Sequence, residues 1–255
     1  MDAATLLAVE AFLVPSGATE IRDGIRSAMA AFDCARMRTE FDPTTGRVHL
    51  LGHVPADEAR TTAVSAVRAQ LGSALLVDDG LRVLPHPQCD VLGRIEASGL
   101  PQSEEQFKDA AMIGAQGFAR EYAFMQGELL RIDLIAPDYD AYVYVDYFDG
   151  DGLVLHLSAT GGTAGLRSAG EVFSVPGSQD GSPPMKFEIA PPFGQDIVLT
   201  IAVNSPLYLS SRPLVETAEE YLDYLQDRMS LLMSEPSFKG EWAYLFVSTS
   251  AADKP

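Results

Sequence analysis

The sequence predicts an α+β protein: a small α/β module followed by an antiparallel β-sandwich with one packed helix. The chain has 255 residues, of which 47% are hydrophobic, enough for one or two cores. Helical and alternating apolar patterns interleave over residues 1–98, whereas alternation dominates over residues 127–255. Residues 1–98 carry nine basic and thirteen acidic side chains, and residues 99–255 carry nine and twenty-three. The net charge therefore changes from −4 to −14, which predicts a domain boundary after Ser98 and a connector over 99–126.

Local patterns place each element of the first module. The expected elements are a helix over 19–32, strands over 35–41 and 47–54, a helix over 55–71 and a strand over 75–84. Asp42 to Gly46 forms the turn between the first two strands, because aspartate, proline and glycine favour turn conformations. Pro55 fits the first turn of the second helix, where no backbone N–H is needed. His49 and His53 share one face of their strand, which we expect to be the solvent side.

This element order surrounds the segment Gly46-Arg-Val-His-Leu-Leu-Gly-His-Val54. Over about residues 19–84 the chain resembles the BON domain of bacterial cell-envelope proteins. The resemblance implies a small non-catalytic module of the periplasm, associated with outer-membrane or secretion machinery and with lipid or ligand binding.

The two cysteines, Cys34 and Cys89, leave two interpretations open. They are either buried free thiols that behave as small hydrophobic residues, or a disulfide that joins the two ends of the first module. A disulfide closing this loop would stabilise the module by about 4 kcal/mol. It would imply a periplasmic or otherwise extracytoplasmic location, whereas free thiols would fit the cytoplasm. Their spacing matches no zinc pattern.

The second module alternates with period two. The expected strands cover 130–134, 142–148, 153–157, 186–190, 196–203 and 242–248. Asp149-Gly-Asp-Gly152 predicts a hairpin turn between the second and third of these strands. Thr217 and Glu220 match a capping box that opens a helix with an apolar stripe ending at Leu232. The segment 158–185 exceeds an ordinary hairpin loop, so we interpret it as either mobile or a binding loop.

The stretch Ile135-Ala-Pro-Asp-Tyr-Asp-Ala-Tyr-Val-Tyr-Val-Asp-Tyr-Phe-Asp-Gly-Asp-Gly-Leu-Val-Leu-His-Leu157 precedes a strand that ends in Asn204-Ser-Pro-Leu207. Over about residues 127–248 this pattern is similar to the domain of unknown function family 4384. That family commonly follows bacterial serine/threonine protein kinases, caspase-like peptidases and related signalling proteins. The resemblance implies a signalling context and brings no catalytic residues with it.

No strong catalytic motif is present. If Phe148 pairs with Leu153, Asp146 and His156 point to opposite faces of the hairpin, so we expect no catalytic dyad. The chain has no Gly-x-Ser-x-Gly elbow, no phosphate-binding loop and no kinase catalytic loop. Asp149 and Asp151 fall short of a calcium loop. We therefore expect no enzyme activity, no cofactor and no metal.

The formal charge of −18 argues against nucleic acid and against direct binding to an anionic membrane. We expect a protein or small envelope ligand as partner, neutral or basic. The candidate recognition surface comprises Tyr142, Tyr144, Tyr147, Phe148, Asp149 and Asp151. The alternative is that these aromatic side chains form ordinary core.

Together the observations predict a binding, sensor or adaptor module of the bacterial cell envelope, the extracytoplasmic part of a kinase-linked signalling system. The alternative is a structural accessory protein of a secretion or envelope-assembly apparatus.

Overall fold

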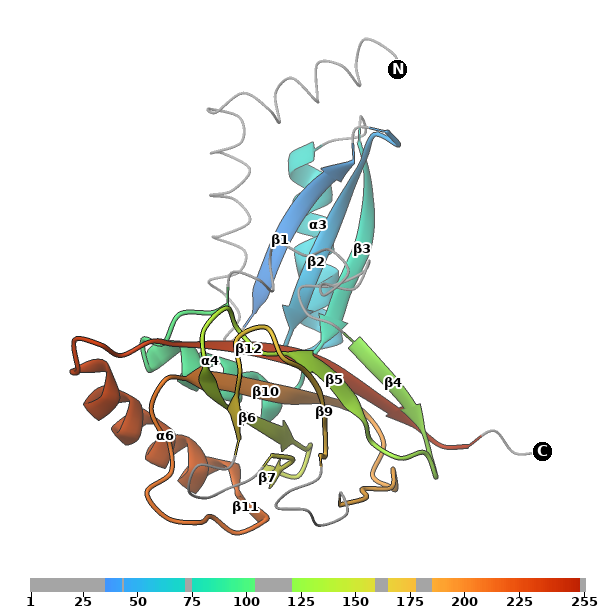
Figure 1. The fold of residues 1–255 in the computed structure, drawn as a ribbon. Helices are drawn as coiled ribbons and strands as arrows, with labels where there is room; N and C mark the ends of the chain where they lie inside the picture. The colour runs from blue at the N-terminus through green and yellow to red at the C-terminus, as the bar shows by residue number, and fades with distance from the viewer. Residues whose placement is uncertain are drawn as a thin grey trace. The chain divides into compact units, whose positions relative to one another are not determined.

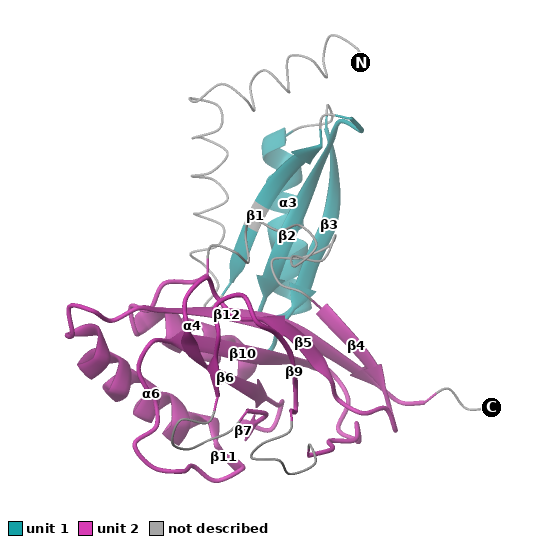
Figure 2. Ribbon diagram, in the orientation of Figure 1, with its two compact units in different colours: residues 1–85, 113–118 teal, residues 86–112, 119–255 magenta. Residues whose placement is uncertain are grey.

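The computed structural model describes residues 35–42, 44–71, 75–103, 121–158, 165–177 and 185–252, and these form a mixed α+β protein (Figure 1). The chain divides into two compact units, residues 1–85 with 113–118, and residues 86–112 with 119–255 (Figure 2). The boundary thus follows Pro85 rather than Ser98. The reason is helix α4 (Gln88–Ala97), which packs against α6 (Ala218–Met233) of the second unit.

The first unit is a three-stranded sheet with one helix. Its elements are β1 (Arg36–Asp42), β2 (Arg47–Val54), α3 (Asp57–Leu71) and β3 (Leu76–Val83). The strand order is β1-β2-β3, with β1 antiparallel and β3 parallel to β2. Leu50 and Val54 pack with Ala63 and Val67 of α3 in a buried cluster. These elements match the predicted ones, and the helix expected over 19–32 lies outside the described residues.

Side-chain hydrogen bonds stabilise the turn between β1 and β2, and the two histidines of β2 differ in exposure. The Asp42 carboxylate accepts hydrogen bonds from the Thr44 N–H and the Thr45 hydroxyl, and these bonds lower its pKa. His49 is partly exposed, with its Nδ1 3.4 Å from Asp78. His53 is buried, so the expectation that both histidines face solvent was wrong for His53.

The second unit contains a seven-stranded sheet and a separate two-stranded sheet. The large sheet comprises β4 (Glu121–Met125), β6 (Ala141–Phe148), β7 (Leu153–His156), β8 (Leu166–Arg167), β10 (Gln195–Val203), β11 (Val215–Thr217) and β12 (Gly240–Ser250). Its order is β11-β7-β6-β10-β12-β4, with β8 also on β6. All pairs are antiparallel except β12 with β4. The small sheet pairs β5 (Ile132–Ile135) with β9 (Val172–Val175).

The two faces of the large sheet are covered by different elements. On one face Phe148 of β6 lies against Tyr221 of α6, with ring centroids 6.2 Å apart. On the other face Val143 and Val145 share a core cluster with Ile132 of the small sheet. The alternation of side chains along β6 therefore separates a helix-covered face from a face covered by β5 and β9.

The start of α6 and its N-cap at Thr217 are confirmed, because the Thr217 side chain accepts a hydrogen bond from the Glu220 N–H. Three parts of the second unit differ from expectation. β4 lies inside the predicted connector, β8 and β9 lie inside the segment 158–185, and the strand expected over 186–190 is reduced to one bridge between Leu129 and Glu188. No helix in the described part of the chain has the length and apolar character needed to cross a membrane.

Candidate functional site

The β6–β7 hairpin has a register that places Asp146 opposite His156. Phe148 pairs with Val154 rather than with Leu153, so the predicted register was wrong by one residue. The cause is the turn, where the Asp149 carboxylate accepts the N–H groups of Asp151 at 3.0 Å and Leu153 at 2.9 Å. These bonds, with the bond from the Asp149 N–H to the Leu153 carbonyl, hold Leu153, the first residue of β7, opposite Asp149. Asp146 and His156 are thereby brought to the same face of the sheet.

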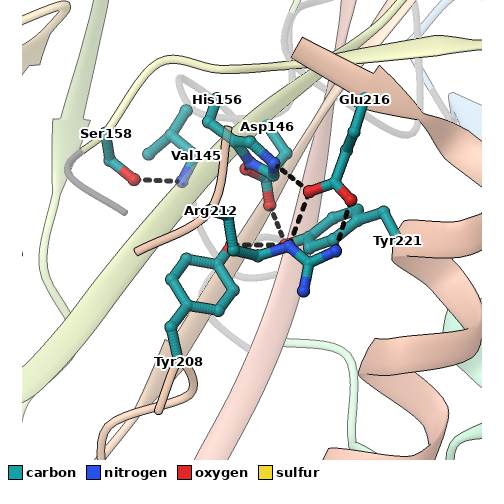
Figure 3. A network of polar contacts seen from close by, with 8 residues as sticks. All are labelled: Val145, Asp146, His156, Ser158, Tyr208, Arg212, Glu216 and Tyr221. Carbon is teal, nitrogen blue, oxygen red and sulfur yellow. Dashed lines mark hydrogen bonds and ion pairs between the residues drawn. The ribbon is translucent and has the colours of Figure 1, made fainter. Parts of the chain in front are cut away.

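A buried polar cluster surrounds His156 (Figure 3). His156 Nδ1 lies 2.6 Å from Asp146 Oδ1, and His156 Nε2 lies 2.8 Å from Glu216 Oε1. The Tyr221 hydroxyl donates to the second Asp146 oxygen, and the Arg212 guanidinium donates to both oxygens of Glu216. We call Asp146, His156, Arg212, Glu216 and Tyr221 the His156 cluster. It joins β6, β7, β11, α6 and the segment before β11.

The environment of the cluster favours an imidazolium at His156. Burial lowers the pKa of His156, but the hydrogen bonds and negative charges of Asp146 and Glu216 outweigh burial and raise this pKa above its ordinary value. Burial raises the pKa of Glu216, yet Arg212 and His156 reverse the balance and hold it below its ordinary value. Burial and the Asp146 charge raise the pKa of Tyr221, which stays a neutral donor. Each charge in the cluster is thus matched by an opposite charge.

Substrate cannot contact the histidine or the aspartate, since their side chains are 0% exposed. A histidine paired with an aspartate also occurs in catalytic triads, but a general base must lie within reach of the proton that it removes. The buried His156–Asp146 pair does not meet this condition. The cluster has instead the features of a polar core, in which opposite charges and hydrogen bonds compensate for burial. It fixes β11 and the start of α6 to the β6–β7 hairpin.

The predicted recognition surface is divided by the sheet. Tyr144 is 2% exposed and Phe148 is 1% exposed, so these two side chains belong to the core and are unavailable to a partner. Tyr144 accepts a hydrogen bond from the Leu207 N–H, and its burial raises its pKa to about 12. Tyr142 and Tyr147 are half-buried.

The remaining predicted residues have other positions. The Tyr147 hydroxyl donates to Asp196 Oδ2 over 2.6 Å, which satisfies a buried carboxylate. Asp151 is exposed in the turn that Asp149 organises. Cys89 is buried in α4, and Cys34 lies outside the described residues, so their disulfide stays a prediction.

An apolar cavity of about 380 Å³ lies between the small sheet and the large sheet. Leu134 and Phe173 contribute from β5 and β9, and Val143, Ala202 and Leu245 contribute from β6, β10 and β12. We call this cavity the β5–β9 pocket. Its size falls within the range of small-molecule sites, and its walls are mainly hydrophobic, as in such sites. No short sequence motif predicts the β5–β9 pocket, because its walls come from strands far apart in the chain.

A more open groove of about 760 Å³ adjoins this pocket. Asp138 and Glu241 line both hollows. Tyr139 lines the groove, and its hydroxyl donates to the Ala202 carbonyl over 3.3 Å. Burial, followed by the charges of Glu241 and Asp138, raises the pKa of Tyr139, so the hydroxyl stays protonated. Within the described ranges, neither Asp138 nor Glu241 has a hydrogen-bond or ion-pair partner.

The described part of the chain contains no group of three or more His, Cys, Asp or Glu side chains placed to hold a metal ion. The β5–β9 pocket, with its apolar walls and with Asp138 and Glu241 at its mouth, is the candidate site for a ligand, and the His156 cluster lies on the opposite face of the large sheet. Searches against family models, curated proteins and solved structures each returned no match.

Proposed function

We propose that the protein is a non-enzymatic binding, sensor or adaptor module of the bacterial cell envelope, and that its second unit binds a ligand in the β5–β9 pocket. The observation that carries the proposal is an open apolar cavity at whose mouth Asp138 and Glu241 have no hydrogen-bond or ion-pair partner among the described residues. On the other face, the side chains of Asp146, His156 and Glu216 are buried, and their polar atoms are hydrogen-bonded within the His156 cluster.

The envelope location and the kinase-linked signalling context come from the resemblance of residues 19–84 to BON domains and of residues 127–248 to the domain of unknown function family 4384. The ββαβ order of the described first unit is consistent with the first resemblance. In this proposal the second unit is a β-sandwich, in which β5 and β9 form a short second layer over the large sheet. A ligand held between the layers would be positioned to alter how they pack.

A neutral fluorescent probe tests the proposal. The probe N-phenyl-1-naphthylamine brightens in apolar cavities, so the full chain should bind it saturably. Ala202→Phe should weaken binding at least tenfold, because the larger side chain fills the β5–β9 pocket. Since Ala202 is 8% exposed and its replacement could disturb folding, Ile135→Ser at the exposed rim provides a second variant.

The matched control is Leu231→Ser on α6. Ile135 is 53% exposed and Leu231 is 63% exposed, so both changes remove an exposed apolar side chain. Only Ile135 lines the pocket. Equal loss of binding in both variants, or no saturable binding by the unaltered chain, would contradict the proposal.

A further inference from the structure

We infer that the ligand is a small amphiphilic organic cation, whose ammonium group contacts Asp138 and Glu241 while its apolar part enters the β5–β9 pocket. This inference rests on the proposed function, since it names the ligand class for the same pocket.

The two carboxylates lie where the pocket and the outer groove meet. Asp138 follows β5 closely in the chain, and Glu241 lies near the start of β12. Both residues line the apolar pocket and the outer groove, so the two hollows meet at these side chains. A ligand that entered the pocket from the groove would therefore keep one part beside two negative charges.

The lining of the outer groove carries a surplus of negative charge. Asp138, Glu235 and Glu241 line the outer groove, and Lys239 is the basic residue among its described lining side chains. Lys239 Nζ lies 5.8 Å from the centroid of the Tyr139 ring, near the outer limit of a cation–π contact. The surplus of negative charge and the nearby ring favour a further cation, because both attract an ammonium group.

The pocket restricts what kind of cation fits. A bare metal ion would leave the apolar walls formed by Leu134, Phe173 and Leu245 in contact with water. A molecule with an alkyl or aryl part would cover those walls, and the volume of about 380 Å³ suits a small molecule. The combination of apolar walls and an acidic mouth thus selects an amphiphile with a positive end.

Three ligands with one tail and different heads test the inference. Octylammonium, octanol and octanoate are each titrated, below the concentration at which they form micelles, against the full chain loaded with N-phenyl-1-naphthylamine. At low salt and pH 7, octylammonium should displace the probe at a concentration at least about tenfold lower than octanol, and octanoate should be the weakest. The advantage of octylammonium should decrease at 0.5 M salt, because salt screens exposed charges.

The double variant Asp138→Asn/Glu241→Gln should reduce the preference for octylammonium over octanol to within about twofold. The double variant Asp227→Asn/Glu219→Gln removes the same charge from exposed positions of α6 and should keep the preference. Probe binding without a head-group preference would overturn this inference and leave the proposed function standing. Displacement by a lysine-rich peptide but not by octylammonium would also overturn it, in favour of a protein partner. Failure of the unaltered chain to bind the probe would overturn both proposals.

Discussion

Replacing His156 with leucine should destabilise the protein strongly, because the change removes the positive charge that Asp146 and Glu216 share in the protein interior. His156 contacts Asp146 at 2.6 Å and Glu216 at 2.8 Å. A hydrogen bond to a charged group contributes about 1.5–3 kcal/mol, and breaking a buried ion pair costs about 3–5 kcal/mol. Asp146 keeps the Tyr221 hydroxyl and Glu216 keeps Arg212, which limits the loss. We expect the free energy of unfolding at pH 6 to fall by about 3–5 kcal/mol.

The cost of this variant should depend on pH. The folded pKa of His156 is raised above the unfolded value of about 6.5. The stabilisation from the imidazolium is therefore complete below about pH 6.5 and is lost as pH rises through the folded pKa. In that window the difference between the unaltered chain and the variant should shrink by up to about 1.4 kcal/mol per pH unit.

Urea denaturation followed by circular dichroism at pH 6, 7.5 and 9 measures both effects. His86→Leu is the control, because the side chain of His86 is 53% exposed and its pair with Asp90 lies at the surface. That change should cost no more than about 1 kcal/mol. If His156→Leu costs as little as His86→Leu at pH 6, or if its cost is the same at pH 6 and pH 9, the assigned role of the His156 cluster is incorrect.

Three further measurements test other parts of the structure. Thr217→Ala removes the hydroxyl that caps α6 and should lower the unfolding free energy by about 1 kcal/mol in urea denaturation; an unchanged midpoint would exclude a stabilising cap. Gly240→Ala should destabilise by about 1–3 kcal/mol, because a Cβ there would lie 2.9 Å from three neighbouring side chains; thermal denaturation at an unchanged midpoint would show that these neighbours yield freely. A thiol assay on the unfolded chain without reductant should detect no free thiol, whereas two titratable thiols would exclude the disulfide predicted between Cys34 and Cys89.

Local sequence patterns predicted those elements whose signals lie within one segment. The Asp42 turn, the strands on either side of it and the capped helix from Ala218 all follow from residues a few positions apart. The β6–β7 register depended instead on one side chain. The Asp149 carboxylate accepts the N–H of Leu153, so Leu153 lies opposite Asp149 rather than opposite Phe148. A shift of one residue in a strand reverses which face each side chain occupies. The observed register places His156 opposite Asp146, whereas the predicted register put the two side chains on opposite faces.

Other differences arise from contacts between distant segments. The stretch that forms β4 has no strong strand pattern of its own. It is a strand because it pairs in parallel with β12, which is distant in the sequence. Helix α4 has a local signal, since Val91, Leu92 and Ile95 are spaced for one apolar helix face, but its packing against α6 depends on a distant segment. The β5–β9 pocket had no comparable signal, as its walls meet only when the two sheets pack.

Charged side chains are paired on one face of the large sheet but not at the cavity on the other, and this difference favours a ligand at that cavity. On the face that packs against α6, His156 and Arg212 neutralise the carboxylates of Asp146 and Glu216, so these charges interact mainly with each other. On the face beneath β5 and β9, Asp138 and Glu241 line a cavity without such partners among the described residues. Charges that are already compensated contribute stability and register, whereas uncompensated charges beside apolar walls favour a cation from outside. A cationic ligand is therefore attracted more strongly to the carboxylates at the mouth of the β5–β9 pocket than to those of the His156 cluster.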